Sequence, residues 1–92
     1  MLDFRFILDE QPIHARNLGY AGGIEEEEFK RAQELKLAEN HLDCYGKFRW
    51  NSQQVRQKWA MLTPSIEVAI PNLASIVKQA FAGGCGLVAF GD

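Results

Sequence analysis

Alternation of apolar and polar residues opens the chain. The apolar side chains that share one face of the expected strand are Leu2, Phe4, Phe6 and Leu8. This period of two is typical of a half-buried strand. A turn follows at residues 9–12, and weaker alternation over residues 13–18 predicts the second strand of a hairpin. The glycine-rich stretch 19–23 then predicts a flexible joint before the next element.

Residues 24–43 carry the clearest helical pattern in the chain. Their apolar positions recur at helical spacing, namely Phe29, Ala32, Leu35, Ala38 and Leu42. A run of glutamates stands at the expected N-terminus, where the helix dipole favours negative charge. No glycine or proline interrupts the pattern. The sequence therefore predicts one long amphipathic helix over this range.

Shorter elements are expected in the second half of the chain. Residues 44–50 alternate in a way typical of a short strand or an extended loop, and residues 52–62 have helical spacing. Prolines at the starts of segments 64–70 and 71–82 favour two further helices, because proline is well tolerated at the first helical position. The apolar run 87–90 predicts a closing strand near the centre of the sheet.

These elements predict an α+β fold in a single compact domain over residues 1–92. We expect an N-terminal β-hairpin, one long amphipathic helix, two or three shorter helices and a C-terminal strand that closes a small antiparallel or mixed sheet. The hydrophobic content of 47% fits one globular core. No apolar run approaches the roughly 20 residues that a membrane span needs. With two cysteines and no recognisable secretory signal, a cytoplasmic location is expected.

Charge is distributed unevenly along the chain. Residues 1–44 hold ten acidic and five basic side chains, whereas residues 45–92 hold two acidic and five basic ones. We therefore expect a surface on which acidic and basic side chains are segregated. Such a surface suits partner binding, because complementary potentials guide the encounter of protein partners. The predicted partner-binding residues are Glu25, Glu26, Glu27 and Glu28 on the acidic side and Lys47, Arg49, Arg56 and Lys58 on the basic side.

The sequence contains no complete catalytic set and no cofactor motif, so we expect no enzyme activity and no cofactor. The function predicted first is a non-catalytic protein-interaction module, an inhibitor or adaptor that binds or occludes a partner macromolecule. Small inhibitors encoded by phages and mobile elements have this size and character. A homodimer through the sparsely charged segment 59–91 is compatible with this hypothesis.

Nucleic-acid binding through residues 47–58 is the first alternative. Lysine and arginine neutralise phosphates, and unpaired bases stack on aromatic rings. The competing interpretation of the same segment is structural. It places Phe48, Trp50 and Trp59 in the core and leaves the cations to solvate the surface.

A thiol enzyme that uses Cys85 is the second alternative. A reactive thiolate needs a neighbouring cation, an imidazole or a helix N-terminus, whereas Cys85 follows the predicted end of a helix. The residues His14, His41, Cys44 and Cys85 have the composition of a zinc site. Their spacing lacks the close Cys–Cys and His–His pairs that such sites use, so no metal site is predicted.

Overall fold

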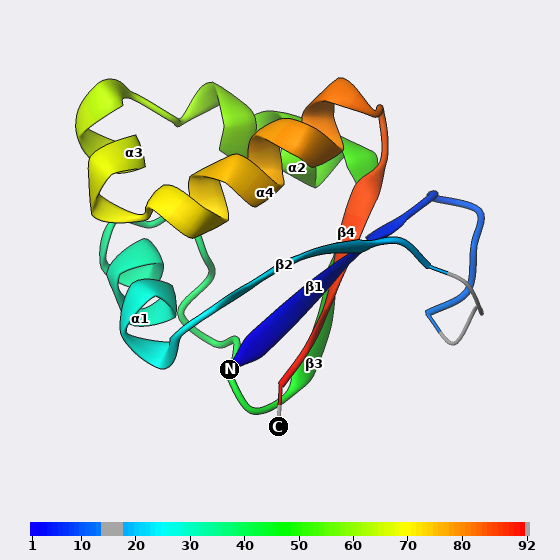
Figure 1. Ribbon diagram of the computed structural model, residues 1–92, viewed down its shortest axis with the longest axis horizontal. Coiled ribbons are helices and arrows are strands. Elements are labelled where there is room, and N and C mark those ends of the chain that lie inside the picture. Colours follow the sequence, from blue (N-terminus) through cyan, green and yellow to red (C-terminus); the bar gives the residue numbers. More distant parts are fainter. Residues whose placement is uncertain (14–17, 92) are drawn as a thin grey trace.

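The computed structural model describes residues 1–13 and 18–91, which form a four-stranded antiparallel sheet and four helices (Figure 1). The strands are β1 (Leu2–Ile7), β2 (Tyr20–Ile24), β3 (Lys47–Trp50) and β4 (Gly86–Phe90). The helices are α1 (Glu26–Glu34), α2 (Ser52–Ala60), α3 (Pro64–Ala69) and α4 (Pro71–Ala82). The predicted α+β fold, its N-terminal hairpin and its C-terminal strand are confirmed. Within the described ranges, none of the helices combines the length and the apolar character that crossing a membrane requires.

Strand β4 lies inside the sheet, whose order is β2-β1-β4-β3. It pairs antiparallel with β1 on one side and with β3 on the other. Leu87, Val88 and Ala89 are consequently buried. A strand with neighbours on both edges and cover on both faces reads as a continuous apolar run, which explains why this segment lacks alternation.

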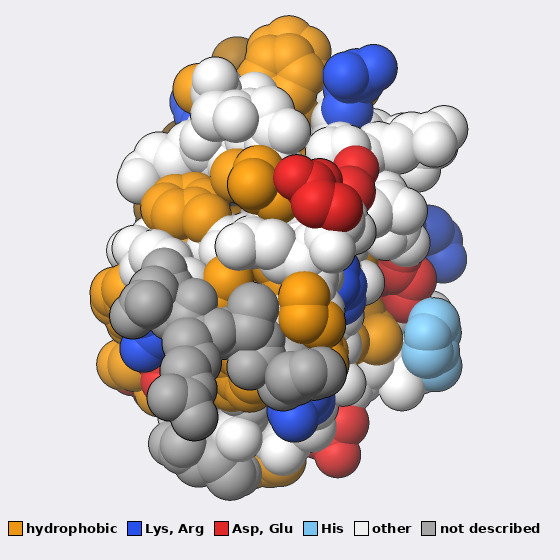
Figure 2. All heavy atoms as spheres, turned by 90° about the vertical axis from the view of Figure 1, so that its right-hand side faces the viewer, with side chains coloured by type: hydrophobic (Ala, Val, Ile, Leu, Met, Phe, Trp, Pro, Cys, Tyr) orange, Lys and Arg blue, Asp and Glu red, His pale blue; other side chains and the backbone are white. Residues whose placement is uncertain are grey.

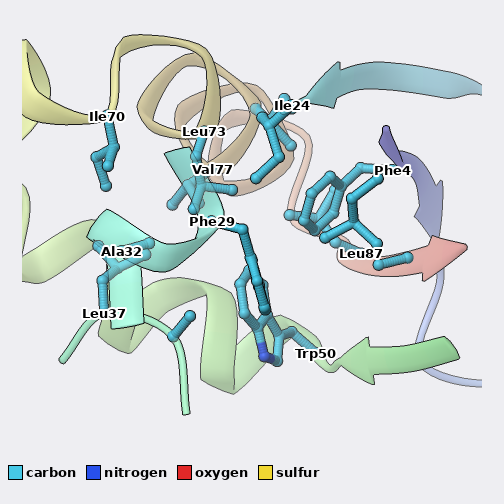
Figure 3. Packing of buried hydrophobic residues seen from close by; sticks show 14 of the residues in the cluster. Phe4, Ile24, Phe29, Ala32, Leu37, Trp50, Ile70, Leu73, Val77 and Leu87 are labelled. Atoms are coloured by element: carbon cyan, nitrogen blue, oxygen red, sulfur yellow. The ribbon is translucent and has the colours of Figure 1, made fainter. Parts of the chain in front are cut away.

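The main core lies between the sheet and the helices. Side chains from β1, β2, β3 and β4 and from α1, α2 and α4 converge there (Figure 3). The rings of Phe4, Phe48 and Trp50 form its aromatic centre, with centroids 5.3–6.0 Å apart. The structural interpretation of the aromatic residues is thus confirmed for Phe48 and Trp50. It is wrong for Trp59, which is 41% exposed and stacks on Phe81 with a centroid distance of 4.0 Å.

The connection after β1 covers part of the other sheet face. Ile7 and Val88 are buried but lie outside the main core cluster. Val88 is flanked in register by Arg5 on β1 and Arg49 on β3. Both arginines reach this connection: Arg5 donates to the carbonyl of Leu18, and Arg49 donates to carbonyls within residues 8–11. The described parts of this connection, residues 8–11 and Leu18, are therefore held against this face by the two arginines.

The long helix predicted over residues 24–43 is wrong in its length. Helix α1 ends at Glu34 and is followed by Lys36 in the left-handed region, with φ 63°. The amide of Lys36 donates to the carbonyl of Gln33, and the amide of Leu37 donates to that of Ala32. These two bonds form a Schellman motif. Burial of Leu37 against the core favours this ending even though no glycine is available there.

The second strand of the hairpin is displaced from its predicted position. Strand β2 occupies residues 20–24, whereas the sequence pattern favoured residues 13–18, of which 14–17 lie outside the described residues. Two of the glycines expected to form a joint, Gly22 and Gly23, are part of the strand. Gly22 has φ +143°, and a Cβ on it would lie 3.0 Å from a side-chain atom of Ile76 on α4. Close packing of β2 against α4 therefore requires glycine at this position.

Candidate functional site

The glutamates of residues 25–28 have two different roles. Glu28 is only 5% exposed, and its carboxylate accepts hydrogen bonds from the Leu73 amide at 2.7 Å and the Asn72 side chain at 2.9 Å. It thereby caps the N-terminus of α4, which has no cap from its own N-cap residue. Glu25, Glu26 and Glu27, in contrast, line an open hollow of about 380 Å³ together with Lys30. These three form the acidic part of the candidate site.

Tyr45 is tied to this acidic part by a hydrogen bond. Its hydroxyl donates to the Glu26 carboxylate at 2.6 Å, and Lys30 pairs with the same residue at 3.1 Å. The hydrogen bond from Tyr45, with a smaller contribution from Lys30, lowers the pKa of Glu26. The same bond raises the pKa of the Tyr45 phenol. The pair orients the tyrosine ring while leaving 58% of the residue exposed.

Two further large side chains continue the exposed surface from Tyr45. Met1 and Tyr20 are 56% and 55% exposed. Met1 lines a hollow of about 220 Å³ with Tyr45, Glu25 and Glu26. Its Sδ and the Tyr20 hydroxyl both lie within about 3 Å of the place where a Cβ on Gly23 would stand, so these two side chains are neighbours. We call the set Met1, Tyr20, Tyr45, Glu25, Glu26 and Glu27 the tyrosine–glutamate surface.

Sequence reasoning missed the apolar members of this surface. Both tyrosines stand in glycine-containing segments, and each was read only as part of a joint or a short strand. Their hydroxyls are bonded to carboxylates: Tyr20 donates to Asp3 at 2.9 Å, as Tyr45 does to Glu26. The one available signal was composition, because an exposed tyrosine is enriched where proteins contact partners.

The predicted basic candidates do not form one group. Arg49 directs its guanidinium at the carbonyls of Leu8, Asp9 and Gln11, at 2.6–3.1 Å. The loop that it fixes is also held by Asp9, whose carboxylate accepts from the Ser52 amide. Both terminal nitrogens of the Arg49 guanidinium therefore donate hydrogen bonds within the molecule.

Lys58 is also bonded within the molecule, where its side chain is buried. Its ammonium donates to the Leu37 carbonyl at 2.8 Å, pairs with Glu39 at 3.1 Å and lies 4.4 Å from the centre of the Trp50 ring. Trp50 in turn donates its indole N–H to Glu39. This network attaches the segment after α1 to β3 and α2.

Lys47 and Arg56 remain as exposed cations in the segment proposed for nucleic-acid binding. Lys47 lies over the Phe90 ring at 5.5 Å, on the sheet face away from the core. With Arg49 and Lys58 engaged and Phe48 and Trp50 buried, residues 47–58 offer few groups to phosphates or bases. The side of the molecule seen in Figure 2 carries charged side chains of both signs interspersed with apolar ones.

The sparsely charged segment 59–91 contributes nine apolar residues to the buried interior. Its buried members are Ile70, Leu73, Ala74, Ile76, Val77, Ala80, Leu87, Val88 and Ala89. Trp59, Met61 and Val68 are the large apolar residues of this segment that stay exposed. The fold thus accounts for part of the apolar character that suggested a homodimer, and the dimer itself stays a prediction.

Among the residues that the structure describes, the thiol and imidazole candidates are not assembled into a site. Burial raises the pKa of the Cys85 thiol, and its Sγ lies 3.7 Å from the carbonyl oxygen of Ala80. Desolvation likewise raises the pKa of Cys44. Both shifts run opposite to the activation that a nucleophilic thiolate needs. Across residues 1–13 and 18–91 there is no group of three metal-ligating side chains, and His14 lies outside those ranges.

Comparisons of the chain with protein-family models, with curated proteins and with solved structures returned no match.

Proposed function

We propose that this protein is a non-catalytic interaction module that binds a protein partner through the tyrosine–glutamate surface. One observation carries the proposal: two tyrosines and a methionine, each more than half exposed, lie together beside three glutamates. Tyrosine is enriched among the residues that dominate binding energy, because it buries a large ring at low entropic cost and keeps a polar end.

The charge of the surface indicates the chemistry of the partner. Glu25 and Glu27 are exposed, and Glu26 is partly so. A partner with basic residues around an apolar centre would match this arrangement, since complementary potentials favour encounter and fix orientation. Binding of this kind could block a surface that the partner uses elsewhere, which is the inhibitory form of the function that we propose.

The test compares substitutions in the tyrosine–glutamate surface with a substitution of an exposed apolar residue elsewhere on the molecule. Tagged wild type, the double variant Tyr20→Ala/Tyr45→Ala and the control Val68→Ser are used to capture proteins from the native host. Val68 is 81% exposed on α3 and lines neither hollow. Circular dichroism checks that all three are folded.

We expect one or more proteins to bind wild type and the control but not the double variant. With the purified partner, each tyrosine truncation should weaken binding about tenfold, which corresponds to about 1.4 kcal/mol. Raising the salt concentration should slow association, because the glutamates act through screened charge. Partners that bind the double variant as tightly as wild type would refute the proposal.

A further inference from the structure

Strand β2 forms one edge of the sheet. Among residues 1–13 and 18–91, it pairs only with β1, and none of these residues forms a strand on its outer side (Figure 1). In the described ranges, no hydrogen bond joins the outer side of residues 20–24 to another segment. An edge of this kind presents a row of backbone N–H and C=O groups, which is a template for a further strand.

The two edges of the sheet differ in how they are protected. Strand β3 carries Lys47 and Arg49, and charged side chains discourage pairing at an edge. Strand β2 has no charged residue and no proline. Its only irregularity is a register shift at residues 20–22, and the ladder is regular from Gly22 to Ile24. Edge protection is therefore weaker on β2.

Packing explains why β2 carries two consecutive glycines. Gly22 faces Ile76, as described above, and a Cβ on Gly23 would lie 2.8 Å from the Sδ of Met1. Both positions are too tight for a larger residue without movement of their neighbours. A strand with consecutive glycines lets another backbone approach closely.

We propose that the partner binds by adding an extended strand antiparallel to β2, with basic residues at the N-terminal end of that strand. This inference rests on the proposed function, because β2 crosses the tyrosine–glutamate surface. Tyr20 begins the strand, and Glu25 follows its last residue. Strand addition obtains affinity from main-chain hydrogen bonds and specificity from alternate side chains.

Direction follows from the sheet and from the charges. Every pairing in the sheet is antiparallel. An antiparallel guest places its N-terminal end beside the end of β2, where Glu25, Glu26 and Glu27 line the larger hollow. Its C-terminal end lies beside Tyr20, where an apolar side chain can contact the exposed ring. The order of basic and apolar residues in the guest is thus fixed.

A second copy of this chain fits the edge less well. Two β2 strands paired about Gly22 would place Glu25 of one copy opposite Gly19 of the other. The glutamates would then face no cation at that position. A guest strand with an N-terminal lysine or arginine satisfies both the edge and the charges, so we assign the edge to a partner segment of that chemistry.

The experiment uses the full chain and labelled peptides. The probe is Arg-Lys-Thr-Val-Thr-Val-Thr-Tyr, and its reversed-order form is the control. Two N-methylated versions of the probe remove backbone N–H donors at alternate residues, in one phase or the other. In a bound strand, the N–H groups of alternate residues point toward β2 and the others point away from it. Methylation should therefore disrupt binding in only one of the two versions. Binding is followed by fluorescence anisotropy and by hydrogen exchange of the β2 amides.

We expect the probe to bind at least tenfold more tightly than its reversed form. One N-methylated version should lose binding, and the other should stay within about twofold of the probe. The variant Glu25→Gln/Glu27→Gln should lose the order preference, whereas Glu34→Gln, at the other end of α1, should keep it. Protection should increase at the β2 amides.

Absence of probe binding, equal binding of the reversed peptide, or equal effects of the two methylation phases would overturn the inference. These outcomes are separable from a failure of the proposed function. Tyrosine-dependent capture without peptide binding would leave the interaction module standing and refute the β2 edge. Peptide binding without tyrosine-dependent capture would refute the proposed function alone.

Discussion

Replacement of Glu28 tests whether the last of the four consecutive glutamates is structural. The variant Glu28→Ala removes the acceptor of the buried Leu73 amide and the partner of the Asn72 side chain. Loss of a helix cap costs about 0.5–2 kcal/mol. An unsatisfied buried amide costs about 1–3 kcal/mol. Both figures include the loss of the Leu73 hydrogen bond, so they do not simply add. We expect the free energy of unfolding to fall by about 2–3 kcal/mol.

Urea denaturation followed by circular dichroism measures this loss. The urea concentration at the midpoint should fall without a large change in the m-value, which scales with the surface exposed on unfolding. In thermal unfolding of a domain of this size, each 1 kcal/mol of lost stability lowers Tm by about 4–8 °C. The variant Glu28→Gln keeps an acceptor oxygen and should lose only the charge contribution, about 1 kcal/mol.

The neighbour Glu27 supplies the matched control, because it is exposed. Glu27→Ala should change the free energy of unfolding by less than about 0.5 kcal/mol. If Glu28→Ala proved as mild as Glu27→Ala, the assignment of Glu28 as the cap of α4 would be wrong. A large loss in the control would instead mean that all of these glutamates stabilise α1 alike.

Two further predictions concern the segment that follows α1. Lys36→Gly should stabilise the protein by about 1 kcal/mol, because Lys36 has φ 63° and an L-residue in the left-handed region costs about 1–2 kcal/mol. Thermal unfolding should show a higher Tm for Lys36→Gly and no gain for Lys36→Ala, and a lower Tm for the glycine variant would contradict the motif. The second prediction concerns Glu39. Burial alone would raise the pKa of this carboxyl, but hydrogen bonds from its own backbone, from Lys58 and from Trp50, together with the Lys58 charge, lower it overall. A lowered folded-state pKa gives stability that is present above the unfolded value of about 4.3 and is lost as pH falls through the folded value. Glu39→Gln should therefore be less stable than wild type at pH 7, and the difference should shrink on acidification below about pH 4. An unchanged difference across urea titrations from pH 7 to pH 3 would show that Glu39 does not contribute this pH dependence.

The amino-acid sequence by itself determined the elements whose signals are local. Alternation marked β1, proline at the first helical position marked the starts of α3 and α4, and the uninterrupted apolar run marked β4 as an inner strand. Each of these signals depends on neighbouring residues and on the period of one element. The α+β class followed from their order, whereas the sequence left burial of Phe48 and Trp50 as one of two interpretations of residues 47–58.

Only the tertiary structure decided where α1 ends, where β2 lies and what the charged residues do. The helical pattern continued past Lys36, but burial of Leu37 against distant residues favoured a left-handed turn. Glu28, Arg49 and Lys58 looked like surface charges, and each found its hydrogen-bond partners between 19 and 45 residues away in the chain. The physical reason is common to all three. A charged side chain becomes structural when folding brings unsatisfied backbone groups or an opposite charge to it, and the spacing of residues along the chain does not record that proximity.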